Sequence, residues 1–191
     1  MESDPLSLEL PWMNYKAIRW LSRHARNAAV FEWGSGGSTL YLAPLVASLV
    51  SIEHDAAWHK VVGDRIRSET CTLRLVPPVP GPPCPNEVPQ GYRSSRTDFS
   101  QMNFERYCQT IRDYSDESFN VVIVDGRARG SCIHEALPKV KPGGWLVLDD
   151  SDRAQYATGI GLLGGWKRMD FHGPKPGDEG SYQTSVFRRP L

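Results

Sequence analysis

The sequence has little that would attach it to a membrane or to nucleic acid. Its 191 residues carry 22 basic and 22 acidic side chains, and no basic block offers a footprint for nucleic acid or anionic lipid. The longest apolar runs have the length of a strand, far below a bilayer-spanning helix. The acidic segment 1–9 lacks the basic and then apolar layout of a signal peptide. We therefore expect a cytoplasmic protein that binds neither nucleic acid nor a membrane.

Cysteine is also scarce. The chain has four, Cys71, Cys84, Cys108 and Cys132, and no two of them form a Cys-x-x-Cys pair. This spacing indicates neither a zinc site nor a disulfide framework, so we expect reduced thiols, some of them buried. The length suits one well-buried domain and is short for two, so residues 1–191 are predicted to form a single domain.

The most informative stretch is an apolar run that leads into a glycine turn. Residues 28–31 precede Glu32-Trp33-Gly34-Ser35-Gly36-Gly37-Ser38-Thr39, and a helix-like segment follows. Gly34 and Gly36 are expected to permit positive φ and a close ligand, while free N–H groups near Ser38 attract negative or polar groups. A strand, a turn and a helix of this kind are typical of a nucleotide cradle, although Gly-x-Gly also occurs in ordinary turns.

A carboxylate at the expected distance supports the nucleotide interpretation. The apolar run 49–52 ends in Glu53, 19 residues after Gly34. At this spacing a dinucleotide-type fold places the acid that binds ribose hydroxyls.

The rest of the chain alternates strand-like and helix-like segments, which predicts an α/β fold: a doubly wound, mostly parallel sheet with helices on both faces. Strands are predicted at 28–31, 49–52, 71–76, 119–124 and 145–148, and helical segments near 40–47, 58–68, 104–114, 129–137 and 152–163. Two weaker strands at 166–171 and 183–188, joined by a turn at 173–178, are predicted to pair antiparallel at the sheet edge.

An amphipathic helix is predicted over 11–27, because Met13, Ala17, Trp20, Leu21 and His24 recur on one helical face. This helix should lie against the sheet. We interpret His24 as a packed side chain and not as a catalytic one.

A proline-rich segment at 77–100 interrupts the alternation. Its seven prolines between positions 77 and 89 exclude a continuous helix. It leaves the carboxyl end of the third strand, the side on which ligands bind in open α/β sheets, so it is either a lid over the substrate or an ordered spacer. A polyproline ligand for another protein fits an internal loop poorly.

Four segments together resemble the class I S-adenosylmethionine-dependent methyltransferases. They are residues 31–36, 52–55, 122–126 and 137–150, the last of which contains the turn Lys141-Pro142-Gly143-Gly144. The resemblance covers residues 28–188. It implies a Rossmann-like sheet of seven strands whose last two are antiparallel, and transfer of a methyl group to a small-molecule acceptor.

The resemblance also implies a set of cofactor-binding residues. Glu32, Gly34 and Gly36 would line the methionine part of the cofactor, Glu53 would bind the ribose, and Asp125 would face the methyl end or the acceptor. The full expected set is Glu32, Gly34, Ser35, Gly36, Ser38, Thr39, Glu53, His54 and Asp125. The sequence departs from the family pattern at Ser38, where a third glycine is common, and at 76–78, where an acid near the adenine is common; the adenine contacts therefore stay open.

Methyl transfer depends mainly on positioning, and we favour an oxygen acceptor. A hydroxyl group needs a base or a metal ion to remove or acidify its proton. Asp125 and Asp150 are the candidate catalytic residues, with His54 a weaker one. Asp125, Asp149 and Asp150 are also a candidate Mg²⁺ site, because this arrangement resembles that of metal-dependent O-methyltransferases. An ordinary Asp-Gly turn and a helix start remain as alternatives for these acids.

The acceptor itself is not identified. Tyr92, Arg93, Arg96, Arg127 and Arg129 would favour an acidic or phosphorylated small molecule if they lie near the site.

Other functions on the same fold also stay open. A nicotinamide-dependent oxidoreductase would require glycine at position 39, where this chain has Thr39. A non-catalytic S-adenosylmethionine-binding module and an aminopropyl-type transferase are not separated from a methyltransferase by fold alone.

Overall fold

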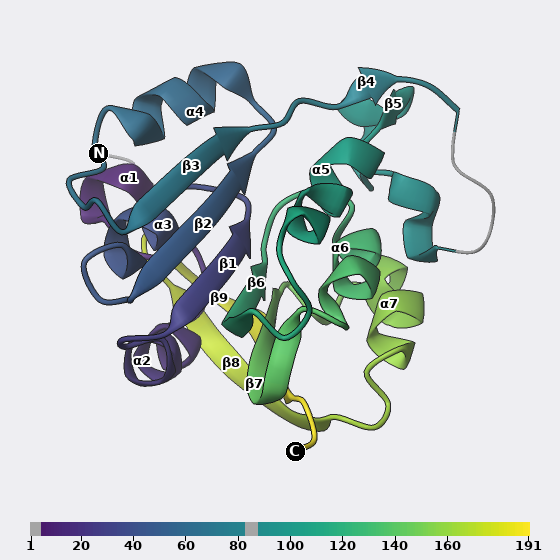
Figure 1. Cartoon of the computed structure of the whole chain (residues 1–191). Helices are drawn as coiled ribbons and strands as arrows, with labels where there is room; N and C mark the ends of the chain where they lie inside the picture. The colour runs from purple at the N-terminus through teal and green to yellow at the C-terminus, as the bar shows by residue number, and fades with distance from the viewer. Residues whose placement is uncertain (1–4, 83–87) are drawn as a thin grey trace.

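The apolar runs of the sequence form the middle of a seven-stranded sheet (Figure 1). The computed structural model describes residues 5–82 and 88–191; Cys84 and part of the proline-rich segment lie outside them. The strands are β1 (Ala29–Trp33), β2 (Ser48–Glu53), β3 (Cys71–Leu75), β6 (Phe119–Val124), β7 (Val140–Asp149), β8 (Lys167–Lys175) and β9 (Asp178–Arg188). Their order is β3-β2-β1-β6-β7-β9-β8, and all neighbours are parallel except β9, which runs antiparallel to β7 and β8. The predicted fold class is confirmed.

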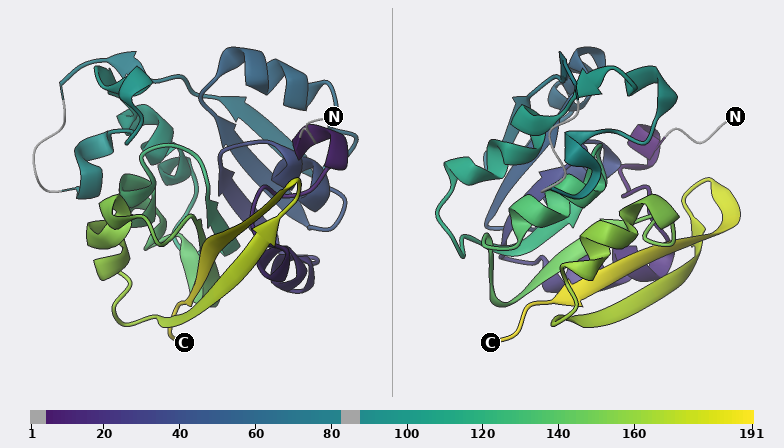
Figure 2. Two further views of the ribbon diagram at one scale, coloured as in Figure 1. Left: turned by 180° about the vertical axis from the view of Figure 1, so that it is seen from behind. Right: turned by 90° about the vertical axis from the view of Figure 1, so that its right-hand side faces the viewer.

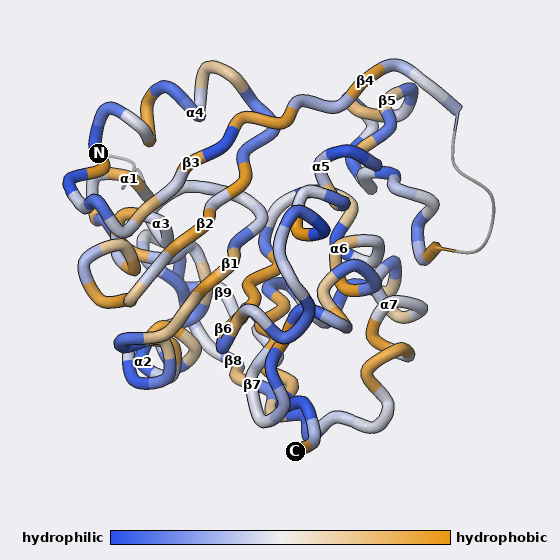
Figure 3. Tube along the Cα trace, in the orientation of Figure 1, coloured by the Kyte–Doolittle hydropathy of each residue, from blue (hydrophilic) through white to orange (hydrophobic). Residues whose placement is uncertain are grey.

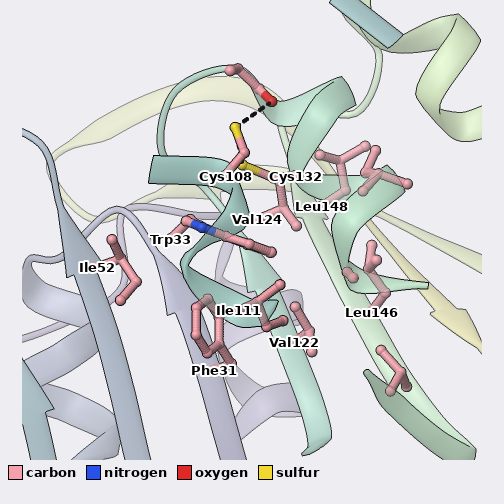
Figure 4. Packing of buried hydrophobic residues seen from close by; sticks show 14 of the residues in the cluster. Phe31, Trp33, Ile52, Cys108, Ile111, Val122, Val124, Cys132, Leu146 and Leu148 are labelled. Atoms are coloured by element: carbon pink, nitrogen blue, oxygen red, sulfur yellow. Dashed lines mark hydrogen bonds between the residues drawn. The ribbon is translucent and has the colours of Figure 1, made fainter. Parts of the chain in front are cut away.

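Helices cover both faces of this sheet because its central strands bury side chains in both directions (Figure 1). On β6, Val121 and Ile123 pack with α2 (Tyr15–His24) and α3 (Gly37–Leu42), whereas Val122 and Val124 pack with α5 (Glu105–Gln109) and α6 (Arg129–Ala136). Figure 4 shows the second of these clusters, and Figure 3 shows the apolar residues concentrated along the central strands. The remaining α-helices are α1 (Pro5–Leu8), α4 (Ala56–Gly63) and α7 (Ala157–Gly161).

The N-terminal amphipathic helix is shorter than predicted. It spans residues 15–24 instead of 11–27, because Asn14 caps its start and Asn27, with φ of +57°, turns the chain into β1. Its predicted face does pack against the sheet, with Ala17 and Leu21 fully buried. His24 is a packed residue as interpreted, since its ring stacks on Trp20 with centroids 4.1 Å apart.

The C-terminal strand pair is longer than the sequence indicated. Residues predicted to form the turn at 173–178 instead continue the ladder, so that Gly173 pairs with Tyr182 and Lys175 with Asp178. Gly177, with φ of +76°, supplies the left-handed position of the remaining tight turn. Figure 2 shows the tip of this hairpin projecting from the body of the sheet near α1.

The described part of the proline-rich segment is ordered. The two-residue strand β4 (Val79–Pro80) pairs with β5 (Met102–Asn103), and the segment contains the 3-10 helices η1 (Pro89–Tyr92) and η2 (Thr97–Phe99). Tyr92 is buried; its N–H donates to Ser131 Oγ at 3.0 Å and its hydroxyl to Glu135 Oε1 at 2.6 Å. These bonds anchor the segment on α6, which is what an ordered spacer requires. A role as a lid stays a prediction.

Two shorter elements complete the chain. The 3-10 helix η3 (Thr110–Asp113) continues α5, and η4 (Ala154–Tyr156) leads into α7. Among the described residues, no helix has the length and apolar character needed to span a bilayer.

Asn14 generates the first testable prediction, because its fully buried side chain joins α2 to the hairpin. Its Oδ1 accepts from the Ala17 N–H at 3.0 Å, and its Nδ2 donates to the Phe171 carbonyl and to Thr184 Oγ1, each at 3.0 Å. Asn14→Ala removes a helix cap and two buried hydrogen bonds, so we expect a loss of about 2–3 kcal/mol in the free energy of unfolding. Chemical denaturation measures this loss.

A matched variant separates the two roles of Asn14. Asn14→Asp keeps the capping oxygen but cannot donate to the carbonyl of Phe171, so we expect it to be no more stable than Asn14→Ala. If Asn14→Asp were as stable as the wild type, only the cap would matter and the bridge to the hairpin would contribute nothing.

Candidate functional site

A cavity of about 550 Å³ opens at the carboxyl ends of β1, β2 and β6, where the strand order reverses. Its volume falls within the roughly 300–1,000 Å³ of small-molecule sites. We call it the larger cavity, because a smaller one lies beside it. It is lined by the glycine turn, residues 53–55 and residues 125–127, together with Arg129, Trp58, Trp12, Arg96, Asp98 and Phe99. The structure therefore brings the glycine turn, Glu53 and Asp125 to one place, as the sequence predicted.

Two glycines make the close approach of β1 and β6 possible. Gly34 has φ of +96°, and a Cβ added there would lie 2.7 Å from the Gly126 nitrogen. A Cβ on Gly126 would lie 1.9 Å from the hydroxyl oxygen of Tyr107 and 3.0 Å from the Gly34 nitrogen. Gly36, in contrast, has an extended φ of 164°, and a Cβ there would come no closer than 3.7 Å to the Trp58 ring. The expected positive φ is therefore found at Gly34 alone of the two.

Glu32 lies beneath the glycine turn and does not reach the cavity. Its fully buried carboxylate accepts hydrogen bonds from the hydroxyl groups of Ser38, Thr39 (2.7 Å) and Ser51 (2.8 Å). Burial raises the pKa of Glu32, and these three donors oppose that effect. Thr39 is likewise fully buried and outside the cavity wall. Neither Glu32 nor Thr39 lines the cavity, and both hold the turn in place from below; their contact with the cofactor stays a prediction.

Glu53 faces the cavity and is ready to accept hydrogen bonds. Its Oε2 accepts from the N–H and hydroxyl of Ser35 at 3.1 and 2.9 Å, and its Oε1 accepts from the N–H groups of His54 and Asp55 at 2.7 and 2.8 Å. Burial opposes its ionisation, but His54 and these donors outweigh burial and lower the pKa of Glu53. The carboxylate is therefore ionised at neutral pH.

His54 completes this side of the cavity. Its Nδ1 lies 2.6 Å from Glu53 Oε1, and its Nε2 accepts a long hydrogen bond of 3.4 Å from Arg127 Nε. Because Nε2 accepts here, a ring proton lies on Nδ1, on the side of Glu53. Phe99 meets the His54 ring edge-on, with centroids 5.4 Å apart.

The sequence interpretation missed the aromatic walls of the cavity. Trp58 donates from Nε1 to the Ser35 carbonyl at 2.8 Å, and its position is fixed because Asp55 caps the start of α4 by accepting from the Trp58 N–H. Its place in the first turn after β2 was a usable signal. Trp12 and Phe99 reach the cavity from remote segments, so no local pattern identified them.

A family comparison identifies the kind of protein that carries this cavity. A family model described as a methyltransferase domain matches residues 31–151, well over half of the chain. The chain belongs to the class I S-adenosylmethionine-dependent methyltransferases. The matched residues include the glycine turn, Glu53, and the acids that follow β6 and β7. A search of curated proteins found no match.

Solved structures place the methyltransferase in the same fold. A methyltransferase-like protein from Silicibacter pomeroyi is 22% identical, with a TM-score of 0.59 over 94% of this chain and 89% of its own. The O-methyltransferase TomG from Streptomyces achromogenes, solved with S-adenosylmethionine, is 15% identical, with a TM-score of 0.61 over 100% and 92%. The N-methyltransferase NodS from Bradyrhizobium japonicum is 16% identical, with a TM-score of 0.56 over 100% of both chains. These likenesses show the fold alone, and the family match sets aside the nicotinamide-dependent oxidoreductase.

Arg129 organises the acids of the methyltransferase at the ends of β6 and β7. This buried guanidinium lies 2.9 Å from Asp125 Oδ1, 3.5 Å from Asp150 Oδ2 and 3.9 Å from Asp149 Oδ2. Burial and the neighbouring Asp149 raise the pKa of Asp125, although Arg129 opposes them. The three acids converge as predicted, but they converge around the side chain of an arginine.

The predicted Mg²⁺ site is not supported by this arrangement. Within residues 5–82 and 88–191, no three His, Cys, Asp or Glu side chains are grouped so that they could hold a metal ion. The Arg129 guanidinium takes the position between Asp125, Asp149 and Asp150 that a cation would need. The sequence analysis counted the acids but did not weigh the arginine four residues after Asp125, at the i, i+4 spacing of a helical ion pair.

The close approach of Gly34 and Gly126 gives the second prediction. Gly126→Ala places a methyl group against the hydroxyl of Tyr107, which is itself fully buried and cannot swing away, so we expect a loss of at least about 3 kcal/mol in unfolding free energy. Introducing Tyr107→Phe alongside Gly126→Ala should recover part of this loss. Gly161→Ala is the control, because nothing lies within 4 Å of a Cβ there. Equal stability of all three variants would show that the lack of a side chain at Gly126 is not a steric requirement.

Asp149 gives the third prediction, which concerns pH. Burial raises the pKa of Asp149 from its ordinary 3.8 to about 6, against the opposing charge of Arg129. Because the folded state favours the protonated acid, this contribution to stability is complete below about pH 4 and is lost as the pH rises through about 6. Asp149→Asn cannot ionise, so its stability relative to the wild type should rise by up to about 3 kcal/mol between about pH 4 and pH 7.

Urea denaturation at a series of pH values measures this difference. Asp152→Asn, at an exposed position in the same turn, is the control. If Asp149→Asn and the wild type changed stability in parallel over the whole range, Asp149 would not be the group responsible.

Proposed function

We propose that the methyltransferase binds S-adenosylmethionine in the larger cavity, with Glu53 at the ribose hydroxyls and the turn Gly34–Ser38 beside the methionine part. The ionised Glu53 supports this assignment, since a carboxylate is the natural acceptor for a diol. Ser35, Gly36 and Ser38 line the cavity, while Glu32 and Thr39 fix the turn that carries them.

The charge of the cavity also fits this cofactor. Asp125 lines it, is largely buried, and shares Arg129 with Asp149 and Asp150. A sulfonium or ammonium cation near Asp125 would be attracted to its carboxylate. When bound, S-adenosylmethionine supplies an electrophilic methyl carbon, and the chain's own residues have to hold the acceptor in line with it.

The proposed acceptor is the oxygen of a small molecule. A second cavity of about 310 Å³, lined by Asp150, Tyr156 and Lys175 among others, shares Gly126, Arg127 and Arg129 with the larger one. Asp125 borders the first cavity and Asp150 the second, so each can accept a hydroxyl proton at their common wall. The observation that carries this assignment is geometric: the two carboxylates lie on either side of the wall that the cavities share.

We propose that residues 1–191 act as one domain, since Trp12 ahead of α2, the proline-rich segment and the hairpin each border one or both of the two cavities and none of them forms a separate substrate domain. The direct test is methyl transfer from isotopically labelled S-adenosylmethionine to a panel of hydroxylated and aminated small molecules. NMR analysis of the product assigns the methylated atom. Transfer to nitrogen alone would overturn the oxygen assignment, and cofactor binding without any transfer would favour a binding module.

Glu53 provides the fourth prediction. Glu53→Ala should weaken binding of the demethylated cofactor by about 1.5–3 kcal/mol, because hydrogen bonds from the ribose to a charged acceptor are lost. Titration calorimetry measures the change. Glu69→Ala, which removes an exposed glutamate outside both cavities, is the matched control, and its affinity should equal that of the wild type. Unchanged affinity in a folded Glu53→Ala variant would remove Glu53 from the site.

A further inference from the structure

The second cavity is strongly basic. It lies beside the larger cavity, at the wall formed by residues 126–129, and its other walls come from residues 94–96, η4 and the tip of the β8–β9 hairpin. Five of its lining residues are cations, Arg96, Arg127, Arg129, Arg153 and Lys175, whereas Asp150 is the one acid among the described lining residues. Such an imbalance needs negative charge from elsewhere.

The nearby carboxylates are already engaged by some of these cations. Asp150 Oδ2 lies 2.7 Å from Arg153 and 3.5 Å from Arg129. Asp98 forms a two-point pair with Arg96, at 2.9 and 3.0 Å. Within the part of the chain that the structure describes, Arg127 and Lys175 have no carboxylate within 4 Å.

Arg127 is held in an environment that disfavours its charge. Its guanidinium lies 5.7 Å from the centre of the Phe99 ring, and its Nε donates to His54 Nε2 at 3.4 Å. Burial lowers the pKa of Arg127, and the charges of Arg96 and Arg129 lower it further. A bound anion would relieve this repulsion.

Lys175 is positioned by aromatic rings and not by a counter-ion. Its Nζ lies 3.8 Å from the centre of the Tyr182 ring and 5.0 Å from that of Trp12. Tyr182 belongs to the hairpin, and Trp12 lies in the segment between α1 and α2. Figure 2 shows α1 close to the tip of the hairpin. The ammonium group is thus fixed at the rim of the cavity with hydrogen-bonding capacity to spare.

We propose that the second cavity binds the anionic group, a carboxylate or a phosphate, of the methyl acceptor through Lys175, Arg153 and Arg127. This inference rests on the proposed function, in which the larger cavity holds the methyl donor. Arginine and lysine side chains that converge on one space form strong charge-assisted hydrogen bonds to such oxyanions. The anion would anchor the acceptor at the rim side while its nucleophilic oxygen faces the wall shared with the larger cavity.

The experiment is a calorimetric titration of the full chain with benzoate, phenyl phosphate and neutral benzamide, each with and without the demethylated cofactor. We expect saturable binding of benzoate, phenyl phosphate or both, weakened by salt, and none of benzamide. The two anions distinguish a carboxylate from a phosphate site. Lys175→Gln should raise Kd for the anion about tenfold or more, since a charge-assisted contact is lost. Lys175→Arg should restore binding to within about threefold.

Lys167→Gln, at the opposite end of β8 and exposed, is the matched control and should change nothing. The proposal is overturned if benzamide binds as well as the anions, if neither anion binds saturably, or if Lys175→Gln binds the anions as the wild type does. It is also overturned if Lys175→Gln weakens the demethylated cofactor in place of the anions, because the cations would then serve the cofactor's own carboxylate. Failure of the demethylated cofactor to bind contradicts the proposed function alone, and the titrations without it still decide the anion site.

Discussion

The buried guanidinium of Arg129 is the interaction on which the site depends. It joins the end of β6, through Asp125, to the end of β7, through Asp149 and Asp150. Asp149 in turn accepts from Thr184 Oγ1, which accepts from Asn14, so the network runs from the helix α2 cap across the hairpin into the cavity wall. The attraction within a buried ion pair offsets little more than the free energy lost when its charges leave water. The main effect of this network is therefore to fix the positions of the three carboxylates.

A second layer of support holds the cofactor side. Glu32 links β1 to the start of α3 and to β2 from below the turn. Gly34 and Gly126, which have no side chains, allow the chain segments that follow β1 and β6 to lie in close contact. Glu53, one strand away, is left to face the cavity. The two glutamates therefore divide the work: the buried one shapes the turn and the ionised one offers oxygens to a ligand. Fixing the donors and acceptors before binding lowers the cost of ordering them later.

The sequence predicted the sheet well because each central strand is a continuous apolar run, which only a strand buried on both faces requires. The sequence also carried a signal for the buried position of Glu32: two residues after Val30 on the same strand, its side chain points to the same face of the sheet, toward α3. The metal hypothesis finds no support in the structure because the acids were considered along their strands, whereas Arg129 reaches them from a helix. Trp12, Phe99 and Lys175 lie far apart in sequence, and only the folded chain brings them to the cavities.

The two cavities differ in charge, and Arg129 stands at their boundary. The larger cavity is lined by four acids, Glu53, Asp55, Asp98 and Asp125, and by three arginines, Arg96, Arg127 and Arg129. The second cavity has the same three arginines together with Arg153 and Lys175, and Asp150 is the one acid among its described lining residues. Under the proposed function, a cationic donor and an anionic acceptor would each be disfavoured in the wrong cavity, so this difference in charge would help to orient them across the common wall. Because methyl transfer asks chiefly for alignment of the reacting atoms, such orientation would itself contribute to catalysis. Arg129 contributes to this difference in charge, because it pairs with Asp125, Asp149 and Asp150 and also lines the second cavity.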